Sequence, residues 1–386
     1  MSKSTLKILL IILLVMALAA ELIFLGVRYG RSQPEEPALS GTLPAETSAP
    51  TEAPPTETVT EAPTEVFTEP PTEAPTEPKP ETFTLTFVGD CTFGGSPQGA
   101  NYSLGFVLTV GEDYLYPFEN VSHYFTGDDF TMLNLEGALC EGGTAVLKEY
   151  NFRGTPAYTG ILTQNSVEAV TIANNHTYDF GQEGYDSTTA ALKDAGVPYA
   201  EDDGTVIVTT ESGLTIGIYA ATYAAMTEDK IVAGITSLRE NPDVELIIFA
   251  AHWGTENSFR SSEKQRDLGR AAIDAGAHIV YGTHPHVLQP IEEYNGGIIY
   301  YSLGNFCFGG NNNPKDFDTA LIQQMVIRDP DGTVRLGGTL IVPCSVSSIT
   351  SRNDFKPTPY SADSDRYQRV LEKLSGEYRG ANLPVG

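Results

Sequence analysis

Four of the six histidines stand in short polar motifs that follow apolar, strand-like runs. They are His176 in Asn174-Asn175-His176, His252 after Ala250-Ala251, and His284 and His286 in His284-Pro285-His286. Asp90 and Glu136 hold the same position after two earlier runs. Imidazole, carboxylate and amide groups together bind Zn, Fe or Mn well. Because strand carboxyl ends border the ligand crevice of open α/β sheets, this distribution predicts a metal centre.

The number of candidate ligands is sufficient for two ions. Two metals roughly 3.5–4 Å apart are clamped by about six ligands, and a bridging carboxylate can contact both. The sequence offers six candidates, which are Asp90, Glu136, Asn175, His252, His284 and His286. Pro285 breaks the strand, so we expect a tight loop that aims its two rings at different ions. Asp179 either orients His176 or caps a helix that begins near Gln182.

Each candidate taken alone has an ordinary structural explanation. A strand-end histidine is commonly a hydrogen-bonded surface residue, and an aspartate after a glycine commonly forms a turn. Polar residues at the ends of five apolar runs are harder to explain in this way, so we interpret the set as functional. His123 and His278 lie outside such motifs, and we interpret both as structural.

The elements that must position these side chains alternate between strand and helix. Strand-like runs are expected at 83–90, 131–135, 169–173, 206–210, 215–220, 245–251, 278–281, 297–302, 320–327 and 334–342. The clearest helix is 262–275, with Ser261 or Ser262 as its N-cap and Gly276 as its stop, and 363–378 is expected to be a final helix. This alternation predicts an α/β fold, and the later runs favour a mixed sheet or two sheets packed together.

The N-terminus carries a long apolar run, Ile8 to Val27, interrupted only by Glu21. Twenty helical residues span a bilayer core of roughly 30 Å, so we expect residues 1–31 to form a membrane anchor. A cleaved signal peptide or a buried core helix would be the alternative, but no clear cleavage site follows the run. We therefore expect a single-pass protein of the cell membrane whose C-terminal domain is extracellular.

Residues 32–82 have a different composition from the rest of the chain. The segment repeats Thr-Glu-Ala-Pro and its variants, and it holds 12 of the 25 prolines and 11 acidic residues against one lysine. Proline removes backbone donors and like charges repel, so the segment is predicted to be a disordered linker. The remaining residues, 83–386, are predicted to form the folded domain.

The net charge excludes some partners. Formal charge is −27, and because residues 1–31 carry +3 and residues 32–82 carry −10, the domain itself carries −20. Charge of this sign repels phosphate backbones, so nucleic acid is excluded as a partner. Contact with an anionic polymer would have to be local, at the metal centre.

Several motifs in order resemble the bacterial CapA family of capsule-synthesis, poly-γ-glutamate-associated proteins. They are FVGDCTFGG, NLEG, NFRGTP, TIANNHTYDFGQEG, AAHWGTE and YGTHPHVLQPIEEYNGGIIYYSLGNFCFGG. Members of the family are similar to calcineurin-like metallophosphatases. The resemblance therefore implies a four-layer α/β/β/α sandwich of the metallophosphatase type, with an N-terminal anchor and the domain outside the cell.

The resemblance also implies roles for individual residues. Asp90 matches the first metal ligand, Glu136 the bridging carboxylate and Asn175 a ligand, while His176 matches the general acid. His252, His284 and His286 match the three later histidines of the superfamily. Thr92 stands where metallophosphatases have a histidine, and Glu replaces Asp at the bridging position. One metal thereby loses a ligand, so the resemblance leaves open whether the site binds one ion or two.

Two further residues, Arg153 and Asn305, are candidates for substrate contacts. Arg153 could meet an anionic group or form a surface salt bridge, and Asn305 could line the floor of the site or form a turn.

The four cysteines are expected to be structural. Cys91 and Cys140 could form a disulfide, but buried free thiols are the expected state, and Cys307 and Cys344 are assigned to the core.

Two functions from different classes fit these observations. The first is a metal-dependent hydrolase of an extracellular amide or phosphoester, with His176 and Asp179 as its catalytic residues. The second is a non-catalytic factor that binds or exports a surface polymer through a degenerate metal site. Both place the chain with a poly-γ-glutamate-like polymer or its synthesis machinery, and charge does not separate them.

Overall fold

The computed structural model describes residues 79–96 and 105–383. The expected anchor and residues 32–78 of the expected linker lie outside the described residues. In the described part of the chain, no helix combines the length and apolar character needed to cross a bilayer. The first strand, β1 (Glu81–Thr92), begins two residues before the predicted domain boundary. Glu81 belongs to the domain because it pairs with Arg328 in the sheet and through an ion pair.

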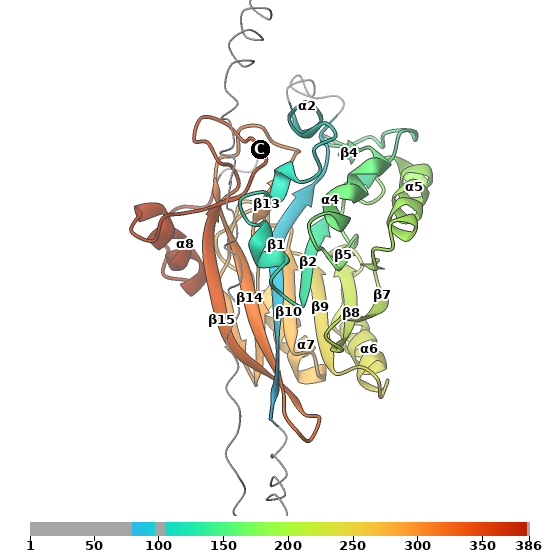
Figure 1. Ribbon diagram of the computed structural model, residues 1–386, viewed down its shortest axis with the longest axis vertical. Coiled ribbons are helices and arrows are strands. Elements are labelled where there is room, and N and C mark those ends of the chain that lie inside the picture. The colour runs from blue at the N-terminus through green and yellow to red at the C-terminus, as the bar shows by residue number, and fades with distance from the viewer. Residues whose placement is uncertain (1–78, 97–104, 384–386) are drawn as a thin grey trace, which may run out of the picture. The chain divides into compact units, whose positions relative to one another are not determined.

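The described strands form two large mixed sheets and one small sheet (Figure 1). In spatial order, the first sheet contains β16 (Thr358–Pro359), β15 (Val334–Ser345), β14 (Asp318–Arg328), β1, β2 (Phe130–Leu135), β5 (Ala169–Thr171) and β6 (Tyr199–Ala200), and β13 (Asn305–Phe308) also pairs with β1. The second contains β11 (Ile291–Tyr294), β12 (Gly297–Tyr300), β10 (Ile279–Thr283), β9 (Leu246–His252), β8 (Thr215–Thr222) and β7 (Gly204–Thr209). The short strands β3 (Ala138–Leu139) and β4 (Arg153–Gly154) pair with each other.

Both sheets are parallel at their centres and antiparallel towards an edge. Strand β1 runs parallel to β2 and β13 and antiparallel to β14. Strand β9 runs parallel to both β8 and β10, whereas β7 and β11 are antiparallel edge strands. The expectation of mixed sheets in an α/β fold is therefore confirmed.

The two sheets pack face to face, and helices cover their outer faces. One apolar cluster joins residues of both sheets, including Phe87 of β1 and Ile248 of β9. A second cluster lies between the first sheet and its helices, and a third lies between the second sheet and its helices. The helical segments on the first sheet are α2 (Phe106–Val110), η2 (Tyr116–Phe118), α3 (Ser122–Phe125), η3 (Pro156–Tyr158), α4 (Thr159–Thr163) and α5 (Gly181–Asp194). The helices on the second sheet are α6 (Glu228–Arg239) and α7 (Glu263–Ala275). The result is a sandwich of four layers.

The two helices expected from the sequence are present. Helix α7 begins after Ser262, whose side chain forms a capping box with Gln265, and it ends at Gly276 in a left-handed conformation. These are the start and stop signals that the sequence indicated. The final helix, α8 (Asp365–Ser375), is shorter than expected because Gly376 stops it.

Candidate metal centre

The ends of the parallel strands bring the predicted ligands together. Register within the first sheet pairs Asp90 with Asn134 of β2 and with Asn305 of β13. Register within the second sheet pairs His252, the last residue of β9, with Thr283 of β10. Because neighbouring parallel strands end at the same edge, polar residues distant in sequence become neighbours there.

Asp90, Glu136 and His252 form a buried group whose ligand atoms all lie within 4.8 Å of one another. Burial, reinforced by the nearby Asp90 carboxylate, raises the pKa of Glu136 well above its ordinary value. Burial also lowers the pKa of His252 well below its ordinary value, and His284 and His286 add to this effect. Two buried carboxylates so close together are destabilising unless a cation compensates their charge.

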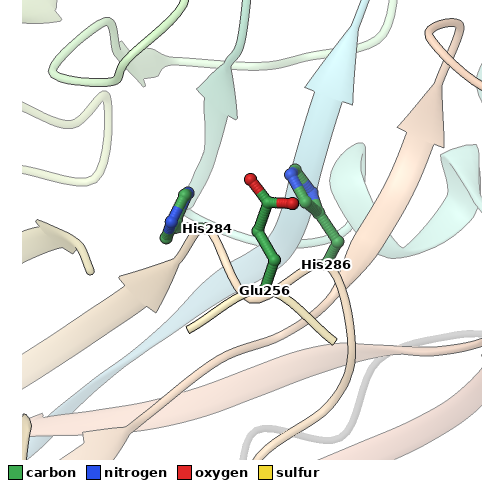
Figure 2. Close-up of side chains that lie close together, drawn as sticks. All are labelled: Glu256, His284 and His286. Carbon is green, nitrogen blue, oxygen red and sulfur yellow. The ribbon is translucent and has the colours of Figure 1, made fainter. Parts of the chain in front are cut away.

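A second group consists of Glu256, His284 and His286, again with ligand atoms within 4.8 Å of one another. Figure 2 shows the Glu256 carboxylate between the two imidazole rings. His284 and His286 have φ angles of 97° and 58°, in the left-handed region that is costly for residues other than glycine. Such strain persists only where the surrounding structure enforces it, and here it accompanies convergence of both rings on Glu256.

Two buried polar atoms in these groups have no hydrogen-bond partner among the described residues. They are Oε1 of Glu136 and Nδ1 of His284. Leaving a buried polar atom unpaired costs about 1–3 kcal/mol, and more when the group is charged. Imidazole nitrogen and carboxylate oxygen are suitable donors for divalent Zn, Fe or Mn. The residues present therefore fit one or two divalent ions.

His286 connects the two groups. Its Nδ1 atom lies 3.2 Å from Oδ2 of Asp90 and 2.9 Å from Oδ1 of Asn305, while Nε2 lies 3.7 Å from Oε1 of Glu136. Burial acts to lower the pKa of His286, but the charges of Glu136 and Asp90 outweigh it and raise the pKa to about 10. The same concentration of negative charge would favour a metal cation.

Asparagine side chains hold the carboxylates and one histidine in place. The Nδ2 group of Asn134 donates to Oδ1 of Asp90 at 2.8 Å and lies 3.3 Å from Oε2 of Glu136. Asn174 donates to Oδ1 of Asn134 at 3.1 Å, which orients that amide. Oδ1 of Asn175 lies 2.8 Å from Nε2 of His252, so this predicted ligand reaches the first group.

His176 lies beside the two groups and has its own polar partners. Its Nδ1 atom lies 2.8 Å from Oδ2 of Asp179 and 3.1 Å from Nζ of Lys148, and its ring packs against Phe152. Nε2 faces the other way, 3.7 Å from Oε1 of Glu136. Asp179 therefore orients His176, and α5 begins without a side-chain cap from it. Burial lowers the pKa of His176, although Asp179 opposes this effect.

A cavity of about 350 Å³ opens beside these residues. Its lining includes His176, Glu256, His286, Asn305, Phe152 and Phe308. Polar side chains and the rings of Tyr150, Phe152 and Phe308 line it together, which is usual for a small-molecule site.

Residues 84–310 match the model of a known family, the bacterial capsule synthesis protein PGA_cap. This match covers more than half of the chain. The chain belongs to the PGA_cap family. It is 30% identical to the capsule biosynthesis protein CapA of Bacillus anthracis, over 76% of the chain and 74% of that protein. It is 27% identical to the PGA biosynthesis protein CapA of Bacillus subtilis, over 76% of the chain and 78% of that protein.

A further PGA_cap relative and two solved structures complete the comparison. A probable polyglutamine synthesis accessory protein of Mycobacterium tuberculosis is 26% identical over 66% of the chain and 74% of its own length. The NAD nucleotidase of Haemophilus influenzae has a TM-score of 0.41 at 13% identity, covering 77% of this chain and 63% of the other. A purple acid phosphatase from yellow lupin has a TM-score of 0.31 at 10% identity, covering 68% and 53% respectively.

Some predicted residues of this PGA_cap protein lie outside the two groups. The Arg153 guanidinium stacks over the Phe180 ring at 4.8 Å, and Arg153 does not line the cavity, so its substrate contact stays a prediction. Thr92 belongs to neither group, and its buried hydroxyl has no hydrogen-bond partner among the described residues. All four cysteines are buried and free, as expected.

Sequence reasoning missed two residues of the site. Glu256 lies four residues after His252 in the same loop, within the AAHWGTE motif, and this spacing was the available signal. Lys148 contacts Oδ1 of Asp179, and its Nζ donates to the carbonyl oxygen of Asn175 at 2.9 Å. Lys148 stands in an irregular stretch, where no periodic pattern indicates the direction of a side chain.

Proposed function

We propose that this PGA_cap protein is a metal-dependent hydrolase that processes a capsule or surface polymer. The observation that carries the proposal is the pair of His/carboxylate groups beside a cavity, with two buried ligand atoms unpaired among the described residues. The scissile bond would be a γ-glutamyl amide or a phosphoester. The names of the relatives in capsule and PGA biosynthesis support a role with such a polymer or its synthesis machinery.

The proposed ligands are those that converge at the strand ends. Asp90, Glu136 and His252 would hold one ion with Asn175, and Glu256, His284 and His286 would form or complete a second site. A divalent ion supplies Lewis-acid chemistry that polarises the bond to be cleaved and favours ionisation of water.

His176 would move the proton that hydrolysis requires. With a proton on Nδ1, His176 would donate a hydrogen bond to Asp179, and Nε2 would be free to face the reacting groups. In the imidazolium form, Nε2–H can protonate the leaving nitrogen or oxygen as general acid. Lys148 would hold the Asp179 carboxylate in place through its ion pair. Asn305, which lines the cavity, would contact substrate.

A non-catalytic role is the second candidate, and Thr92 is the observation that favours it. A hydroxyl at this position replaces the imidazole that the metallophosphatase resemblance would require, so the centre has one strong donor fewer. In that case the centre would bind polymer carboxylates during export or attachment without cleaving them.

One experiment separates these functions. The full-length protein, purified without chelator and refilled with Mn, Fe or Zn, is analysed for metal per chain and tested on γ-glutamyl oligomers and phosphoesters. Metal with turnover supports the hydrolase, and metal without turnover supports the binding factor. If no metal is bound, both forms of the metal proposal are wrong.

Membrane attachment is part of the proposal. We propose that residues 8–27 anchor the chain and that residues 32–78 hold the domain outside the cell. Cell fractionation with N-terminal sequencing tests this. Full-length protein in the membrane fraction is expected, whereas a mature chain that begins near Gln33 in the medium would contradict it.

A further inference from the structure

A second cavity, of about 330 Å³, lies between α8, the segment before β14 and the C-terminal segment. Four basic side chains line it, Lys315, Arg366, Arg369 and Lys373, against one carboxylate, Asp316. The chain has only 23 basic residues against 50 acidic ones. This concentration of positive charge is therefore opposite to the charge of the molecule as a whole.

Two of the four cations are neutralised inside the protein. Lys373 donates to both Asp316 and Asp318 at 2.7 Å, and Arg369 forms a two-point contact with Asp318. The Lys373 side chain is almost completely buried and lies 4.7 Å from the centre of the Phe259 ring. These contacts fix the floor of the cavity in one arrangement.

Arg366 is the cation that remains available to a ligand. Among the described residues it forms no ion pair, and its guanidinium lies 6.0 Å from the centre of the Tyr360 ring. It lines the cavity from the first turn of α8. Asp316 and Asp318 balance Lys373 and Arg369, and Arg366 adds a positive charge to the lining of the cavity.

The basic cavity adjoins the candidate metal centre. Lys315, Asp316 and Leu383 line both cavities, so the two spaces share part of their walls. An extended chain that occupies the cavity beside His286 could therefore continue towards Arg366. Aromatic walls, including Phe259 and Tyr378, would pack against the apolar parts of such a chain.

We propose that the basic cavity is a subsite for a carboxylate-bearing chain, which positions that chain relative to the metal centre. The inference rests on the proposed function in that the same chain would be the one that the centre binds or cleaves. It also explains how a domain of charge −20 can hold a polyanion. The guanidinium of Arg366 pairs with a carboxylate of the polymer, while the acidic surface elsewhere on the domain repels polymer that lies outside the subsite.

Binding to full-length protein tests the subsite. The probe is a fluorescent γ-glutamyl oligomer, measured by anisotropy in excess chelator, so that a metal contributes nothing. Arg366→Gln should weaken binding about tenfold, since a hydrogen bond to a charged group is lost. The matched control is Arg335→Gln, which removes an exposed arginine of β15 whose ion pair with Asp329 lies elsewhere and should leave affinity within about twofold. Equal affinities for the two variants would overturn the proposal.

Further arms identify the ligand chemistry. The same oligomer with amidated carboxylates should bind at least about tenfold more weakly, and added salt should weaken the charged probe. Polyphosphate that binds as well as the glutamyl oligomer would overturn the assignment to carboxylate. Arg366→Lys should retain most of the affinity. If Arg366→Gln fails to fold, Arg366→Met must weaken binding, and unchanged affinity there would equally contradict the subsite.

The subsite and the metal centre can fail separately. Loss of affinity in Arg366→Gln, with no metal found in the protein, supports the subsite and contradicts the hydrolase. In the opposite result, chelator abolishes binding of the oligomer and Arg366→Gln leaves its affinity unchanged. The oligomer would then bind at the metal centre alone, and the subsite proposal would be wrong.

Discussion

The Nδ1 atom of His176 lies 2.8 Å from Oδ2 of Asp179, three residues further along the same loop. Because Nδ1 is engaged on this side, Nε2 is the only ring atom that can exchange a proton with a ligand at the centre. His176 thus lies next to the proposed metal ligands but is oriented by a residue outside the two groups. This arrangement predicts different consequences for changes at His176 and at a proposed metal ligand.

We expect His286→Ala to lower bound metal per chain, whereas His176→Ala leaves it nearly unchanged. His286 belongs to one ligand group and contacts Asp90 and Glu136 of the other. Metal bound to the folded state also stabilises it, so refilling should raise the melting temperature of the unmodified protein more than that of His286→Ala. Elemental analysis and thermal unfolding, with and without added metal, provide the measurements. Equal metal content in both variants would show that the loop is only structural.

Asp179→Asn should lower turnover by about 10²–10⁴ while metal content is retained, because the amide no longer favours the productive tautomer of His176. Turnover of a γ-glutamyl or phosphoester substrate and elemental analysis are the measurements. Asp186→Asn, the same change at an exposed residue of α5, is the control. Retention of full turnover in Asp179→Asn would remove His176 from the reaction.

Glu256→Gln should weaken metal binding by about 10–100-fold or more, the range found even for residues that only support a ligand. The amide preserves the shape of the side chain but removes its charge. Metal titration of the chelator-treated protein measures the effect. Glu293→Gln, on edge strand β11, is the charge-matched control, and indistinguishable affinities would show that Glu256 is not a ligand.

Deleting residues 32–78 should leave the melting temperature of the domain unchanged, because proline-rich acidic sequence does not supply apolar surface to a core. Extending the deletion through residue 82 should lower the melting temperature, because Glu81 pairs with Arg328 in the sheet and forms an ion pair with its side chain. Thermal unfolding of both deletions against the full chain tests this. A drop of several degrees in the shorter deletion would show that the linker packs.

The sequence singled out Asp90, Glu136 and His252 because each ends or follows an apolar run, and the structure places them close together. Strand patterns could not indicate Glu256 or Lys148, which reach the site from irregular segments. Strand patterns also could not indicate the basic cavity lined by Arg366. Its walls come from segments that are distant in sequence and meet through the packing of α8. Register follows from local pattern, whereas loop conformation depends on tertiary contacts.

The proposed ligands are divided between the two sheets. Asp90 lies near the end of a strand of the first sheet, Glu136 follows another, and the two later histidines follow a strand of the second sheet. The hydrogen bond that the backbone N–H of His284 donates to the Asp90 carboxylate therefore spans 194 residues. Contacts of such large sequence separation form late, after most of the chain has lost its freedom. A newly made chain would thus be unable to bind an ion at this centre until the two sheets have docked. Metal binding would then mark the completion of folding, and a partly folded chain would stay inert.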